Sequence, residues 1–147
     1  MKKMLTEMTK TSIFEVFEKM YFIFLEPGEF EYPAYAMGAF IDFGGSVRGR
    51  LKFLFSRQIV TAMVQNMLNL EESEITGQEI EDCLKETTNM VCGNVLTKLD
   101  AIQRFELHMP EFFKMADSDF IEQDNIEKQA FTSDDGKLGV ILTLFVD

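Results

Sequence analysis

Residues 34–56, "AYAMGAFIDFGGSVRGRLKFLFS", decide the fold that this sequence predicts. Two runs rich in apolar and aromatic residues flank a glycine pair, Gly44 and Gly45, and this pattern is typical of an antiparallel β-hairpin. Apolar and basic side chains alternate in the second run, so they point to opposite faces. The two sets are Val47, Leu51, Phe53 and Phe55, and Arg48, Arg50 and Lys52. This alternation predicts a sheet with one buried face.

Helical patterns lie on both sides of the hairpin. Residues 4–25 carry apolar side chains at spacings of three and four, which predicts an amphipathic helix. After the hairpin, residues 57–70 predict a shorter amphipathic helix. Residues 77–101 then predict a long helix, with Thr76 as its N-cap.

The rest of the chain predicts mainly strands. Residues 103–110, "QRFELHMP", predict a short strand ended by Pro110, whereas residues 111–125 are polar and predict an irregular segment. Residues 126–133 and 137–146 flank a "DDG" turn and predict a second hairpin. This order of elements contains no strand–helix–strand crossover. We therefore predict an α+β fold, with a largely antiparallel sheet packed with long helices, in a single domain spanning the 147 residues.

The charge of the chain argues against two classes of partner. The sequence has 14 Lys and Arg residues against 25 Asp and Glu residues, a formal net charge of −11. Nucleic acids and anionic membrane surfaces both bind clustered cations, so we expect neither as a partner. The lysines of "MKKMLTEMTK" precede no apolar segment of the kind found in signal peptides, and the run "MYFIFL" is too short to span a bilayer. A cytoplasmic location is therefore expected.

The sequence lacks the residues of a self-sufficient catalytic site. His108 is the single histidine, and Cys83 and Cys92 point in opposite directions on the predicted helix, so we expect buried, unbridged thiols and no zinc site. Residues 117–125, "DSDFIEQDN", begin like a calcium loop but have Glu122 where that loop needs glycine. No glycine-rich phosphate loop precedes a helix. An activity would therefore need groups that a partner supplies.

The long helix has two opposed faces when each residue is placed at about 100° from the last. The apolar stripe consists of Ile80, Leu84, Thr88, Val91, Val95, Leu99 and Ile102. Asp82, Glu86, Asn89 and Gly93 lie within about 60° of one another on the opposite side. Relative to alanine, glycine costs a helix about 1 kcal/mol and asparagine about 0.7 kcal/mol at most. This side is thus either a solvated face or a face that docks onto another molecule.

The chemistry of the exposed side suggests a use for it. An asparagine amide is neutral and both donates and accepts hydrogen bonds, so Asn89 can orient a water molecule. Glu86 can pair with a cation on a partner, and Gly93 lets a neighbouring group approach closely. Oriented water is what phosphoryl hydrolysis requires, because positioning and electrostatics dominate that reaction. The metal and the phosphate cradle would then belong to the partner.

The pattern Asp82-x3-Glu86-x2-Asn89-x3-Gly93-Asn94, which runs on as "NMVCGNVLTKL", resembles the signature of the CheC/CheX/FliY family of chemotaxis phosphatases. The resemblance is closest to CheX and extends to the order of elements over nearly the whole chain. It implies a phosphatase that dephosphorylates the phospho-aspartate of a CheY-like response regulator in two-component signalling. It also implies that Mg²⁺ is held by the partner regulator and that this chain binds no cofactor of its own.

The resemblance assigns roles to individual residues. As catalytic residues, Asn89 would enter the regulator's site and orient the attacking water, and Glu86 would contact a lysine there. The partner-binding residues would be Asp82, Gly93 and Pro110. Pro110 corresponds to the family's downstream proline, at a spacing from Asn89 slightly shorter than in CheX.

The resemblance also bears on the number of sites and on assembly. CheC-type members carry a second motif on another helix, but the N-terminal helix here offers Ser12, Glu15 and Glu18 without an asparagine, so a single active helix is implied. A homodimer formed by joining sheets is implied as well. Two alternatives stay open: a non-catalytic binding module that docks on a receiver domain or another signalling protein, and a dimeric scaffold whose helix face is merely solvated. Because an adaptor needs no water-orienting amide, Glu86 and Asn89 favour the phosphatase.

Overall fold

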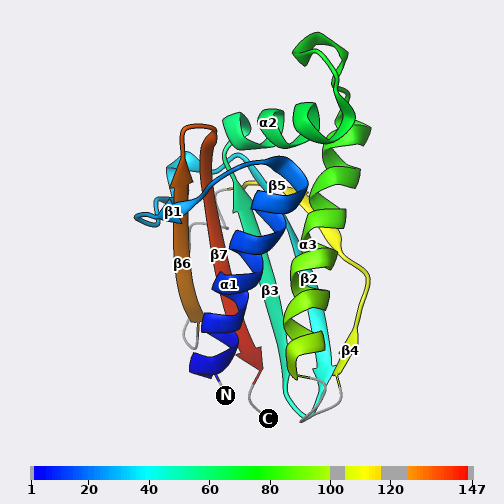
Figure 1. Ribbon diagram of the computed structural model, residues 1–147. Helices are drawn as coiled ribbons and strands as arrows, with labels where there is room; N and C mark the ends of the chain where they lie inside the picture. The colour runs from blue at the N-terminus through cyan, green and yellow to red at the C-terminus, as the bar shows by residue number, and fades with distance from the viewer. Residues whose placement is uncertain (1, 100–104, 117–125, 146–147) are drawn as a thin grey trace.

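The computed structural model describes residues 2–99, 105–116 and 126–145. It shows an antiparallel sheet with two long helices across one face (Figure 1). The helices are α1 (Lys2–Tyr21), α2 (Arg57–Leu68) and α3 (Gly77–Leu99). The strands are β1 (Glu26–Pro27), β2 (Met37–Gly45), β3 (Arg48–Phe55), β4 (Phe105–Leu107), β5 (Glu111–Lys114), β6 (Ile126–Ser133) and β7 (Gly136–Phe145). Short 3₁₀ turns occupy Tyr32–Ala34 and Glu72–Glu74. The α+β prediction is confirmed.

The predicted hairpin lies at the centre of the sheet. The described strands follow the order β1-β6-β7-β3-β2-β4, and β5 also pairs with β2. Strand β3 pairs with β2 from Met37↔Phe55 to Phe43↔Gly49, and with β7 along its whole length. Helices α1 and α3 lie across one face, and α2 crosses the end of the sheet where β3 ends (Figure 1).

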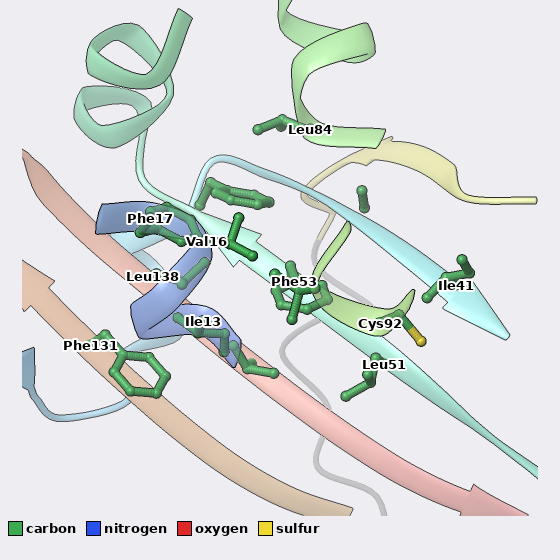
Figure 2. Packing of buried hydrophobic residues seen from close by; sticks show 14 of the residues in the cluster. Ile13, Val16, Phe17, Ile41, Leu51, Phe53, Leu84, Cys92, Phe131 and Leu138 are labelled. Carbon is green, nitrogen blue, oxygen red and sulfur yellow. The ribbon is translucent and has the colours of Figure 1, made fainter. Parts of the chain in front are cut away.

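The predicted alternation is confirmed within β3, but Val47, predicted to share the buried face, lies in the turn before the strand and is half-buried. Leu51 and Phe53 are buried against the helices, in the same cluster as Cys92 of α3 (Figure 2). Arg50 is on the opposite face, where its guanidinium donates to both carboxylate oxygens of Asp42 at 2.6 and 3.0 Å and lies over the Phe40 ring. The basic residues of β3 are therefore on the side of the sheet away from α3.

Helix α1 is shorter at its C-terminal end than the predicted range of residues 4–25. It ends at Tyr21, and Phe22 adopts a left-handed conformation with φ 55°. Ile23 and Leu25 are then buried while Phe22 and Phe24 are exposed, which is the period of two expected for an extended segment. The prediction was wrong there because apolar residues that follow a helix directly can continue its pattern by chance.

Helices α2 and α3 match their predicted ranges closely. Ser56 caps α2 by accepting a hydrogen bond from the Ile59 amide, and Asn69, the C-cap residue after Leu68, adopts a left-handed conformation. At the start of α3, the Glu79 carboxylate accepts from the backbone amide of Thr76 at 2.7 Å. The predicted end of α3 and the predicted core residue Ile102 lie outside the described residues.

The strand prediction was partly wrong in the segment after α3. The predicted strand within 103–110 is confirmed as β4, but the segment 111–125, predicted to be irregular, begins with β5. Four residues are too few to show a period, and β5 forms because β2 offers it a ladder, from Met37↔Lys114 to Phe40↔Glu111. The rest of the predicted irregular segment, which includes the candidate calcium loop at 117–125, falls outside the described part of the chain.

Both cysteines are buried, and neither forms a disulfide, as predicted. Cys92 packs against the sheet, and Cys83 lies on the opposite side of α3, 3.7 Å from the Tyr21 hydroxyl. Burial raises the pKa of the Cys92 thiol to about 12 and also raises the pKa of the Cys83 thiol. Both groups therefore stay protonated at neutral pH.

We expect both thiols to resist modification in the folded protein, because the reactive species is the thiolate and both sulfurs are shielded. Treatment with a thiol-reactive disulfide reagent at pH 8 should give almost no signal from native protein. Two equivalents should appear after unfolding in guanidinium chloride. A thiol that reacts in native protein as fast as free cysteine would contradict the burial of that cysteine side chain in α3.

Candidate functional site

Helix α3 exposes the polar face that its sequence predicts. Asp82, Glu86 and Asn89 are exposed, and Gly93 is half-buried. The described members of the predicted stripe are buried apart from the half-buried Ile80. The buried arc is nevertheless wider than predicted, because α1 and α2 pack against α3 as well as the sheet. The additional buried residues are Cys83, Thr87, Cys92 and Leu96.

Helix α1 fixes the rotation of α3 and hence the direction of its exposed side chains. The Tyr21 hydroxyl lies 2.5 Å from the Thr87 hydroxyl, and burial raises the pKa of Tyr21, so the group remains a neutral phenol. Farther along the helix, the Asn94 amide donates to the Glu15 carboxylate at 3.2 Å. These two contacts hold α3 at Thr87, between Glu86 and Asn89, and at Asn94, five residues after Asn89.

Two polar residues of α1, Ser12 and Glu15, face α3. Ser12 is buried, and the Lys98 ammonium lies 3.4 Å from its hydroxyl and 3.6 Å from the Glu15 carboxylate. The hydrogen bond from Asn94 and the charge of Lys98 lower the pKa of Glu15. Glu18 is exposed. Ser12 and Glu15 therefore both contact side chains of α3. Helix α1 does not present these two residues as a second docking motif.

A hollow of about 410 Å³ lies beside the exposed face of α3. It is lined by Asp82, Lys85, Glu86, Asn89, Met109 and Pro110. The structure therefore brings Asn89 and Pro110 to one place, although 20 residues separate them in the sequence. Gly93 does not line this hollow.

A bulge between β4 and β5 places Pro110 there. Phe43 of β2 pairs with Leu107 and Phe40 pairs with Glu111, so three residues, 108–110, stand opposite two residues of β2. The extra residue bends the chain toward α3. Met109 is 83% exposed, and no pattern in the sequence predicted its place in the hollow.

The charged and polar side chains next to Glu86 and Asn89 on α3 pair with other residues. Lys85 pairs with Glu81 at 3.0 Å, and the Gln78 amide donates to Asp82 at 2.8 Å. Across residues 2–99, 105–116 and 126–145, the side chains of Glu86 and Asn89 have no hydrogen-bond or ion-pair partner. A carboxylate and an amide thus stand side by side with free hydrogen-bonding capacity.

Gly93 borders a second, smaller hollow of about 290 Å³, which Leu96, Thr97, Phe105 and Leu107 also line. A Cβ atom added at Gly93 would meet a single described atom within 4 Å, Leu107 Cδ1 at 3.9 Å. Packing within the described chain therefore does not require glycine at this position.

Replacing Gly93 with alanine should stabilise the isolated protein by about 1 kcal/mol, because alanine is the better helix former and the site has room for a methyl group. Urea unfolding of the two proteins measures this difference. The same variant should bind its partner more weakly if a partner group approaches the bare backbone at Gly93. A variant that is less stable than the wild type would show that the fold itself needs glycine here.

The described residues hold no group of three His, Cys, Asp or Glu side chains placed to bind a metal ion. His108 is exposed, and its backbone amide donates to the Asp42 carbonyl at the β4–β5 bulge. Of the helices in the described ranges, none has the length and apolar character needed to cross a membrane.

Comparisons with known proteins give one family match and several structures with a similar fold. The family model described as chemotaxis phosphatase CheX matches residues 37–131. CheX from Desulfovibrio desulfuricans has a similar structure, with a TM-score of 0.77 and 20% identity, over 96% of this chain and 99% of that one. A chemotactic CheC-like protein from Shewanella oneidensis gives 0.79 and 22%, over 99% and 100%.

A complex of CheX, CheY, BeF₃ and Mg²⁺ from Borrelia burgdorferi contains a third similar chain, with a TM-score of 0.78 and 17% identity over 96% of this chain and 97% of that one. At these identities the solved structures establish the likeness of fold. No curated protein sequence matches the chain.

Proposed function

Because the chain belongs to the CheX family of chemotaxis phosphatases, we propose that it hydrolyses the aspartyl phosphate of a CheY-like response regulator. The observation that carries the proposal is the pair Glu86 and Asn89, exposed on α3 and without a partner among the described residues. The Borrelia relative, solved together with CheY, supports a receiver domain as the partner.

In the proposed mechanism, Asn89 enters the partner's active site and holds a water molecule in line with the phosphorus atom. Its carbonyl oxygen accepts from the water, and its NH₂ group donates to a neighbouring acceptor. The water oxygen forms a bond to phosphorus as the bond to the aspartate oxygen breaks, which releases inorganic phosphate, a free carboxylate and a proton. Asn89 is neutral and takes no proton, so its contribution is positioning.

Glu86 is proposed to anchor the complex, one helical turn from Asn89. It would pair with a lysine near the partner's phosphorylation site, a charge-assisted contact that strengthens as water is excluded. We propose that this chain binds no cofactor. The Mg²⁺ expected in the partner's site would neutralise charge on the phosphoryl oxygens, as metal ions do in phosphoryl transfer generally.

Asp82 and Pro110 are proposed as contacts around this pair, since both line the same hollow. Gly93 lies beyond the hollow and would leave room for the partner backbone. Among the described residues, the cations of this chain do not steer a partner toward this acidic surface. The basic residues of β3 are on the other face of the sheet, and Lys85 already pairs with Glu81. The partner must therefore supply the cations of the interface.

Phosphate release from phosphorylated response regulators, with and without the chain, tests the proposal. An accelerated release from at least one regulator of the same cytoplasm is expected. Binding without acceleration would instead support the alternative function, a non-catalytic module that docks on a receiver domain.

We also propose that the chain forms a homodimer through a sheet edge. Among the described strands, the short β1 lies at one edge of the sheet and pairs with Phe131 and Thr132 of the eight-residue β6. An open strand edge is a template for a second copy. Light scattering coupled to size exclusion should give twice the chain mass of 16.9 kDa, and the mass of a single chain would contradict the dimer.

A further inference from the structure

A third hollow lies on the other side of the ridge that Asp82 and Glu86 form on α3. Its volume is about 460 Å³, and three elements contribute to it. Its apolar lining comes from Met20, Met67, Leu68, Cys83 and Met90, and its acidic rim consists of Glu79, Asp82 and Glu86. We refer to these eight residues as the methionine groove.

Three apolar side chains of this groove are exposed to solvent. Met20 of α1 is 38% exposed, and Met67 and Leu68 of α2 are 39% and 43% exposed. Single exposed apolar residues are ordinary on protein surfaces. Here three of them, from two helices, gather around one concave site, and such clusters mark interaction surfaces.

The groove is continuous with the proposed active face. Asp82 and Glu86 line both hollows, while Asn89 lines one and Met90 lines the other. On a helix, Glu86 and Met90 are neighbours across one turn, about 6 Å apart at their Cβ atoms. A receiver domain that brings its phosphorylation site to Asn89 therefore covers the methionine groove at the same time.

The rim of the groove defines the chemistry of its occupant. Three carboxylates, those of Glu79, Asp82 and Glu86, lie along the α3 side of the apolar floor, and Lys85 beside them pairs with Glu81 on the far side of the ridge. An apolar side chain with a lysine or arginine beside it satisfies both parts of this surface. A second carboxylate-rich surface would be repelled by it.

We propose that the methionine groove is a specificity subsite of the phosphatase, which accepts receiver domains that carry an exposed apolar side chain next to a lysine or arginine beside the phosphorylation site. The inference rests on the proposed function, because it places the groove in the same complex. Methionine side chains are flexible and polarisable, so the groove adapts its shape to apolar groups of different size. The acidic rim supplies the discrimination by charge.

Two substitutions and a matched control test the proposal on the full chain. Met67→Gln and Leu68→Gln make the groove polar at exposed positions, where the fold loses little. Phe145→Gln is the control, because Phe145 is also 43% exposed but is at the end of β7 that lies away from α2 (Figure 1). The probe is a beryllofluoride-activated response regulator of the same organism, and each variant's Kd and its kcat and KM for the phosphorylated form are measured.

We expect Kd and KM to rise about tenfold in Met67→Gln and Leu68→Gln, with kcat unchanged, while Phe145→Gln behaves as wild type. Wild-type values in both groove variants would overturn the subsite and leave the phosphatase intact. Weakened binding in a protein that hydrolyses nothing would support the subsite and reject the catalytic assignment. If the wild type binds no activated regulator at all, both proposals fail.

Discussion

Replacement of Asn89 by alanine is expected to slow phosphate release from the phosphorylated regulator at least 100-fold. The substitution removes the group that orients water, and loss of one preorganised hydrogen-bonding group at a reacting centre typically costs a factor of about 100 to 1,000 in rate. Because Asn89 is exposed and alanine is the better helix former, the fold should be unchanged or up to about 0.7 kcal/mol more stable. Steady-state phosphate release and urea unfolding measure the two effects.

Asn94→Ala is the matched control for this prediction. It removes the same amide from the same helix, but Asn94 donates to Glu15 of α1 and does not line the hollow. We expect slightly lower stability and a nearly unchanged rate. Full acceleration by the Asn89→Ala protein would refute the assigned mechanism, even if the activity itself were real.

Reversal of the charge at Glu86 should weaken the complex with the regulator about 30-fold or more. A lysine at this position would meet the partner's cation instead of pairing with it, and removal of one member of a desolvated charge pair costs about 2 kcal/mol or more. The dissociation constant for the activated regulator, measured by titration calorimetry, should show this loss. The rate at saturating regulator should fall much less than in Asn89→Ala.

Glu7→Lys controls for the change in net charge, because it alters the charge of the chain equally at an exposed position near the start of α1. We expect its affinity to stay close to that of the wild type, since exposed charges beyond about 10 Å are screened at 0.1 M salt. Equal losses in both variants would mean that the overall charge controls binding, and that Glu86 has no specific contact.

Most of the fold could be predicted from short-range patterns in the sequence. The alternation in β3 and the glycine pair before it specify the central hairpin, because side chains on a strand point to alternate faces whatever the strand packs against. Strands β1 and β5 were not predicted, because they depend on contacts between residues far apart in the sequence. They are two and four residues long, and the neighbouring strands β6 and β2 stabilise them through long-range pairing.

The exposed face of α3 could be predicted because helical geometry is local: Asp82, Glu86 and Asn89 share a face in any helix with this sequence. The surroundings of that face could not. The place of Met109 in the hollow depends on the β4–β5 bulge, and the methionine groove depends on how α1 and α2 pack against α3. The single domain of 147 residues, the homodimer and the roles of the site residues stay predictions.

The most direct test of the central claim, that this chain is a phosphatase that acts on an aspartyl phosphate, is phosphate release under multiple-turnover conditions. One part of the chain is added to about 50 parts of phosphorylated, Mg²⁺-loaded regulator, and inorganic phosphate is followed over time. Catalysis by Asn89 predicts release of many equivalents of phosphate per molecule of wild-type chain, and almost none above background with Asn89→Ala. Release at the regulator's own rate in the presence of the wild type, across all regulators of its organism, would contradict the claim.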